Sequence, residues 1–194
     1  MSRLESFIKN LCGKFNNQAQ IKKEESEGEI IHPKAKHINA VCNQKIKNLP
    51  QNFKGYFVIE ESYYETEKGK KILPHLFLFT LDKENNVVLT SYELPKGISK
   101  EEFRNDNGSL IMDYSTLVKS EKFNPMIYKE ENGSFYGESI SDFGNGTIFT
   151  LKERTEHGKL YVSEIFEKNG KVIFGFKDPI VYDKVFGRSE ERRV

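Results

Sequence analysis

The sequence contains no tryptophan, only two cysteines and six prolines, and no apolar run longer than a strand. Two thiols, Cys12 and Cys42, cannot build the disulfide framework of a small secreted domain, so we expect both to be reduced. Runs of this length are too short to span a bilayer as a helix, so we expect no membrane partner. The first residues lack a continuous apolar core and a small-residue cleavage site, which favours a cytoplasmic location.

The sequence also lacks an excess of either charge. Lysine and arginine number 30 and aspartate and glutamate 29, which gives a formal net charge of +1. A protein that binds nucleic acid needs a basic face for the phosphates, and balanced charge argues against that class. We therefore expect no nucleic-acid partner.

The familiar catalytic and metal-binding motifs are absent as well. No glycine-rich phosphate loop follows a strand, and no nucleophile elbow is present. The four histidines lie in separate segments without the spacing of metal ligands, so no metal is expected. They are His32, His37, His75 and His157. These absences favour a protein that binds a small molecule in a cavity.

The 194 residues are enough for one domain with its own core. We expect residues 1–35 to form a helix and linker, residues 36–186 the β-structure, and residues 187–194 a charged tail. Within the linker, the charged run Lys22–Glu29 is typical of a solvated loop.

Two capping boxes predict helix starts. Ser2 with Glu5 precedes apolar residues at helical intervals, which predicts a short helix ending at Gly13. Ser99 with Glu102 predicts a helical turn between strands.

From residue 36 onward the hydrophobic period is two, as in strands. Asn-Gly at 132–133 and 169–170 and His-Gly at 157–158 predict tight hairpin turns. A further short helix is expected at Ser115–Lys122. The expected strands are 36–46, 55–64, 76–81, 87–94, 126–130, 134–139, 147–155, 159–168, 171–176 and 180–186. Such an antiparallel meander hides its edges by forming a barrel or a sandwich.

The strand at 55–64 carries two adjacent carboxylates in an aromatic run. One face holds Tyr56, Val58, Glu60, Ser62 and Tyr64, and the other holds Phe57, Ile59, Glu61 and Tyr63. The face that points inward takes one carboxylate with it, and the register decides which. Either this is an edge strand with one solvated face, or one glutamate lines a ligand pocket inside a barrel.

Four segments carry a resemblance to a known family. They are Phe15-Asn-Asn-Gln-Ala-Gln20, Ile59-Glu-Glu-Ser-Tyr63 after Phe57, Tyr128-Lys-Glu-Glu-Asn-Gly-Ser-Phe-Tyr-Gly137, and Ser163-Glu-Ile-Phe-Glu-Lys-Asn-Gly-Lys-Val-Ile-Phe-Gly175 followed by Pro179. In order and layout the chain resembles the T-type phycobiliprotein lyases, the CpcT/CpeT chromophore lyase family. The resemblance covers most of the chain, although each motif is short.

The resemblance implies a single antiparallel β-barrel domain of the calycin kind, with about ten strands and a short N-terminal helix. It also implies binding of a linear tetrapyrrole (bilin), either phycocyanobilin or phycoerythrobilin. The bilin would be delivered to a cysteine of a phycobiliprotein β-subunit, which would be the partner. A homodimer is left open.

The resemblance and the chemistry of a bilin together suggest site residues. A bilin needs a carboxylate for its pyrrole N–H groups, an aromatic wall and cations for its two propionates. The residues expected to act in attachment are Glu60, Glu61 and Tyr63. Those expected to line the bilin pocket are Tyr56, Phe57, Tyr64, His75, Lys152, Arg154 and Glu164.

The chain departs from the family pattern at two points. Where the family carries Pro-Tyr-Arg, this sequence reads Leu73-Pro-His-Leu76. The family also carries cysteines in the second half of the chain, whereas no cysteine follows Cys42 here. These departures leave open a bilin carrier without lyase activity, or a barrel that binds another small hydrophobic ligand. A protein-interaction module with a solidly packed barrel is a third alternative.

Overall fold

The computed structural model describes residues 1–66 and 69–186. The strands are β1 (Gly13–Asn16), β2 (Lys34–Val41), β3 (Ile46–Lys47), β4 (Tyr56–Thr66), β5 (Gly69–Leu81), β6 (Val87–Tyr92), β7 (Met112–Asp113), β8 (Met126–Glu131), β9 (Ser134–Asp142), β10 (Thr147–Glu156), β11 (Lys159–Lys168), β12 (Lys171–Gly175) and β13 (Ile180–Lys184). The helices are α1 (Arg3–Leu11) and α2 (Gln18–Glu27), with 3₁₀ turns η1 (Asn43–Lys45) and η2 (Tyr114–Thr116). The expected tail at 187–194 lies outside the described residues.

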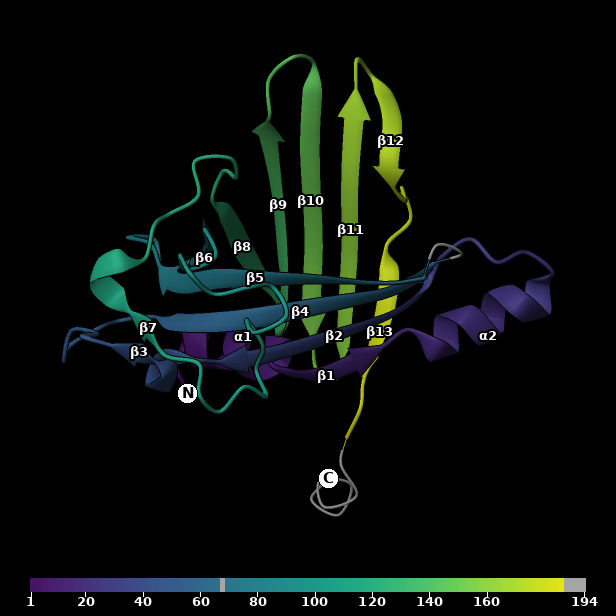
Figure 1. The fold of residues 1–194 in the computed structure, drawn as a ribbon. Helices are drawn as coiled ribbons and strands as arrows, with labels where there is room; N and C mark the ends of the chain where they lie inside the picture. Colours follow the sequence, from purple (N-terminus) through teal and green to yellow (C-terminus); the bar gives the residue numbers. More distant parts are fainter. Residues whose placement is uncertain (67–68, 187–194) are drawn as a thin grey trace.

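Ten strands close into an antiparallel barrel (Figure 1), which confirms the predicted fold class. Their order is β10-β9-β8-β6-β5-β4-β2-β1-β13-β11, and β11 pairs back to β10. Strand β11 pairs with β13 through its first half and with β12 through its second half. In Figure 1, β9 to β12 rise above the strands β2, β4 and β5, which run across them.

Helix α1 packs against one end of the barrel. The predicted capping box is present, since the Ser2 hydroxyl accepts from the Glu5 N–H and the Glu5 carboxylate accepts from the Ser2 N–H. The Phe7 ring lies 5.0 Å from that of Phe79, 4.6 Å from that of Tyr128 and 5.3 Å from that of Phe135. Because Phe7 is fully buried among these rings, it fills this end of the barrel.

A second apolar cluster covers the outer face of β4 and β5. Strands β3 and β7 form a small parallel pair, and the segment between β6 and β8 folds over this face. The cluster includes Phe57, Ile59, Leu76, Leu78, Phe103, Leu110 and Met112. Strand β4 is therefore buried on both faces from Phe57 to Ser62, and neither of the adjacent glutamates Glu60 and Glu61 is solvated.

The prediction of a loop at Lys22–Glu29 is wrong, because most of that run belongs to α2. The helix ends at Gly28, whose φ of 84° suits the left-handed region. Contacts that are remote in sequence fix the helix, and a local charge pattern does not reveal them. Only the 3₁₀ turn η2 is present where a helix was expected at Ser115–Lys122. The strand expected at 36–46 corresponds to β2, which ends earlier, at Val41.

The predicted hairpin turns are confirmed by the backbone. Asn132 and Gly133 have φ of 51° and 79°, and Asn169 and Gly170 have 50° and 76°. Gly175 has a different role at the end of β12. Its φ is 94°, and a Cβ there would overlap the Glu164 carbonyl oxygen, so only glycine lets β12 approach β11 this closely.

Among the described residues, no helix is long and apolar enough to cross a bilayer.

Candidate functional site

The register of β4 directs Glu60 into the barrel. Glu60 pairs with Asn39 of β2 on one side and His75 of β5 on the other. Tyr56, Val58 and Tyr64, which share its face, belong to the barrel core or pack against it. The alternative left open by the sequence is thereby decided in favour of Glu60 as the inward carboxylate.

Inside the barrel, Glu60 belongs to a buried cluster of titratable side chains. Its carboxylate lies 3.6 Å from His37 Nδ1, and the Ser62 hydroxyl lies between the two, 3.4 Å from Glu60 and 3.3 Å from His37 Nε2. Glu153 of β10 lies in the same interior and accepts a hydrogen bond of 2.8 Å from the Tyr128 hydroxyl. Each of these side chains is less than 10% exposed.

Burial and the neighbouring charges shift the pKa values of Glu60, His37 and Glu153. Burial is the largest influence on Glu60 and disfavours its ionisation, but His37, His75 and Ser62 together outweigh it and lower the pKa of Glu60. Burial is likewise the largest influence on the His37 ring and disfavours its charged form, but Glu60 together with Glu164 and Glu153 outweighs it and raises the pKa of His37. Burial and then the Glu60 charge raise the pKa of Glu153 to about 8. The cluster therefore favours the charged forms of Glu60 and His37 and the neutral form of Glu153.

A small cavity opens beside the β4–β5 hairpin, at the ends of these strands remote from α1. The Tyr64 hydroxyl donates to the Glu164 carboxylate at 3.3 Å there. The cavity has a volume of about 140 Å³, and Phe174 and Phe176 supply its aromatic lining. The Lys71 ammonium lies 5.1 Å from the centre of the Phe174 ring. We call this the mouth cavity.

A larger cavity lies next to it, between α2 and the ends of β2 and β4. Its volume is about 430 Å³, and its lining includes Tyr63 and Tyr64. Tyr64 lines both cavities, so they are neighbours. Lysines of three elements also line it: Lys22 of α2, Lys34 and Lys36 of β2, and Lys70 of β5. We call this the lysine cavity.

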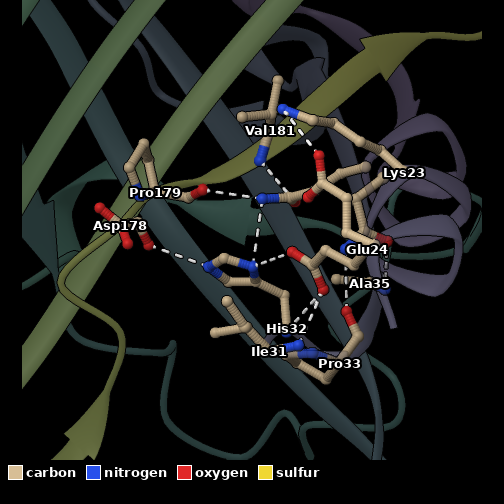
Figure 2. A network of polar contacts seen from close by, with 12 residues as sticks. Lys23, Glu24, Ile31, His32, Pro33, Ala35, Asp178, Pro179 and Val181 are labelled. Atoms are coloured by element: carbon tan, nitrogen blue, oxygen red, sulfur yellow. Dashed lines mark hydrogen bonds and ion pairs between the residues drawn. The ribbon is translucent and has the colours of Figure 1, made fainter. Parts of the chain in front are cut away.

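A polar network attaches helix α2 to β13 and to the residues just before it (Figure 2). The buried His32 ring lies between the Glu24 carboxylate, at 2.5 Å, and the Asp178 carbonyl, at 3.1 Å. Gln20 donates to the Pro179 carbonyl at 3.1 Å and accepts from the Val181 N–H at 2.9 Å. Because this network ties α2 to β13, it fixes one wall of the lysine cavity.

Glu61, the neighbour of Glu60 on β4, lies outside the barrel. Glu61 accepts hydrogen bonds from the Asn105 N–H at 2.7 Å and from the Tyr63 hydroxyl. Burial and then Glu61 raise the pKa of Tyr63 to about 12. These contacts hold the segment between β6 and β8 in place, which is a structural role for Glu61 within the described residues.

The structure does not bring all the predicted pocket residues together. Phe57 lies in the outer cluster, on the opposite face of β4 from Tyr56 and Tyr64. Lys152 and Arg154 lie on the outside of β10, where they pair with Glu138 at 3.4 Å and Glu156 at 2.5 Å. Tyr56 packs against the barrel core, His75 is opposite Glu60 in register, and Glu164 lines the mouth cavity.

Sequence reasoning missed Glu153 and His37. A signal for Glu153 was present, because the alternation that turns Phe149 and Leu151 inward also turns Glu153 inward. His37 had the same kind of signal, since it lies on the same face of β2 as Ala35 and Asn39.

Neither thiol is a ready nucleophile. Burial raises the pKa of Cys12 to about 11 and that of Cys42 to about 12. A thiolate is the reactive form of cysteine, so both side chains serve as packing groups near neutral pH.

The sequence matches no family model and no curated protein.

Proposed function

We propose that this barrel binds a linear tetrapyrrole at its mouth, with the pyrroles at the mouth cavity, and assists its covalent attachment to a cysteine of a phycobiliprotein β-subunit. The observation that carries the proposal is the Tyr64–Glu164 pair at the mouth cavity, next to Phe174 and Phe176. The proposal also draws on the resemblance to the T-type lyases. Attachment of the bilin would take place in the cytoplasm, where bilin and apoprotein meet.

The chemistry of the mouth suits the pyrroles of a bilin. A carboxylate accepts hydrogen bonds from N–H groups, and those to a charged acceptor are stronger than those between neutral groups. Glu164 is the carboxylate at the mouth, and Tyr64 holds it by a hydrogen bond. Phe174 and Phe176 offer aromatic faces for a conjugated ring system.

The proposed mechanism is positional. The S–H of the acceptor cysteine adds across an exocyclic C=C bond of the bilin, so that sulfur bonds to one carbon and the proton goes to the conjugated system. No oxidant or reductant is needed. The barrel would hold the bilin extended and present this carbon to the partner's thiolate. The unreactive state of Cys12 and Cys42 agrees with a mechanism in which the chain forms no thioether of its own.

A transfer assay tests the proposal. The full chain would be incubated with phycocyanobilin and then with a phycobiliprotein β-subunit, and the β-subunit would be examined for covalent colour after denaturation. We expect attachment to the β-subunit to be faster with the chain than without it. A bilin that binds without transfer would make the chain a carrier, and a bilin that does not bind would overturn the proposal.

A further inference from the structure

The mouth cavity alone is too small for a tetrapyrrole. Cavities that hold small molecules have volumes of roughly 300–1,000 Å³, and the mouth cavity measures about 140 Å³. The lysine cavity, at about 430 Å³, lies within that range and shares Tyr64 with the mouth cavity. Lys34 and Lys36 lie on the face of β2 opposite to the buried Ala35 and His37. A ligand with one part at Glu164 would therefore reach the lysine cavity over the rim of the barrel, where β2 begins and β4 ends.

The lysine cavity is built for negative charge. Its lining contains four lysines and two glutamates, Glu25 and Glu65. Lys70 lies 3.6 Å from Glu65, which neutralises one of those carboxylates. Within residues 1–66 and 69–186, the ammonium groups of Lys22, Lys34 and Lys36 take part in no hydrogen bond or ion pair.

The start of α2 adds to this preference. Asn17 and Gln18, at the start of the helix, line the lysine cavity, and the first turn of the helix has no acidic residue. The Asn17 and Gln18 N–H groups donate to the Ala35 carbonyl and the Asn16 side chain, so it is the helix dipole that favours an anion at this end. The Asn17 side chain also fixes the wall, since it donates to the Pro33 carbonyl and accepts from the Ala35 N–H, both at 2.8 Å.

We propose that the lysine cavity binds the paired carboxylates of a dianionic amphiphile, which in the proposed function are the two propionates of the bilin. This inference rests on the proposed function for the identity of the ligand. It replaces Lys152 and Arg154, which are paired on the outer face of β10, as the partners of the propionates. The ligand would lie with its pyrroles at Glu164 and its carboxylates between α2 and the lysines of β2.

Two pigments that differ only in their carboxylates test the inference. Biliverdin and its dimethyl ester would be titrated into the full chain at low ionic strength, with binding followed by absorption. We expect the free acid to bind about tenfold more tightly than the ester, because the ester has no charge for the lysines. In the double variant Lys34→Gln/Lys36→Gln we expect this preference to fall below about twofold, with the affinity for the ester unchanged.

A double variant at exposed lysines remote from the cavity, Lys83→Gln/Lys100→Gln, is the matched control and should keep the tenfold preference. Equal binding of acid and ester to the unmodified chain would overturn the inference while leaving bilin binding intact. A double variant that loses both pigments equally would also overturn it. If neither pigment binds the unmodified chain, the proposed function itself fails, and the inference fails with it.

Discussion

The Tyr64 hydroxyl and the Glu164 carboxylate meet at 3.3 Å, although 100 residues separate them in sequence. Their strands are not neighbours in the barrel, since β2, β1 and β13 lie between β4 and β11. The pair spans the mouth of the barrel, and Tyr64 lines both cavities. Changes at this pair should therefore affect ligand binding more than folding.

The substitution Glu164→Gln is expected to weaken biliverdin binding by about tenfold to a hundredfold. Hydrogen bonds to a charged group contribute about 1.5–3 kcal/mol, and each 1.4 kcal/mol is tenfold in affinity. Absorption titration measures the change. Glu138→Gln, on the exposed outer face of β9, is the matched control and should bind as the unmodified chain does. Equal affinity in Glu164→Gln and the control would remove Glu164 from the binding site.

The buried cluster predicts a barrel that is more stable at pH 5 than at pH 8. The pKa of Glu153 is raised to about 8, so the folded chain keeps a proton that the unfolded chain releases near pH 4.5. This contribution is present below the unfolded pKa and is lost as the pH rises toward 8. The raised pKa of His37 acts in the same direction above pH 6.5. The lowered pKa of Glu60 acts oppositely, but only below about pH 4.5.

Glu153→Gln should remove most of this pH dependence and raise the free energy of unfolding at pH 8 by about 1 kcal/mol or more, since one pKa unit corresponds to about 1.4 kcal/mol. The amide can still accept from Tyr128, so the fold should persist. Urea unfolding at pH 5 and pH 8 gives both values. A variant with the same pH dependence as the unmodified chain would show that Glu153 is ionised in the folded barrel at neutral pH.

Phe7→Ala should destabilise the fold by about 3–5 kcal/mol, because it leaves a cavity among aromatic rings. The control is Ile140→Ala, at a side chain that is 55% exposed, for which a change within about 0.5 kcal/mol is expected. Urea unfolding compares the two. Similar losses in both variants would mean that α1 does not close the barrel end in solution.

Loss of the Glu24–His32 contact should release α2 and leave the barrel folded. In Glu24→Gln the carboxylate that accepts from the His32 ring and from the Ile31 and His32 N–H groups becomes neutral. We expect faster amide exchange across α2 and unchanged exchange in β4 and β5. Glu25→Gln, at an exposed side chain on the same helix, should leave exchange of α2 as it is. Faster exchange throughout the barrel would mean that the network of Figure 2 stabilises the whole fold.

Local chemistry was sufficient to predict most of the barrel. The period-two strands and the Asn-Gly turns placed β8 to β13 nearly at their observed ends. The capping box at Ser2 and Glu5 predicted α1. Helix α2 could not be predicted this way, because its charged sequence is held by Gln20 and Glu24 contacts that reach residues 31–32 and 179–181.

The candidate site was predictable only in part. Alternation identified the two faces of β4, but the choice of Glu60 over Glu61 depends on the register and on the segment that covers Glu61. The same covering segment buries Phe57 outside the barrel. The lysine cavity could not be predicted, because its lysines come from three elements that only the closed barrel brings together.

The measurement that tests the central claim most directly is co-expression of the full chain with the enzymes that make phycocyanobilin, followed by absorption and fluorescence spectra of the purified protein. We predict a coloured, fluorescent complex that survives chromatography, with less bound pigment in Glu164→Gln than in Glu138→Gln. A folded protein that is colourless would contradict the account, and the barrel would then bind a different ligand.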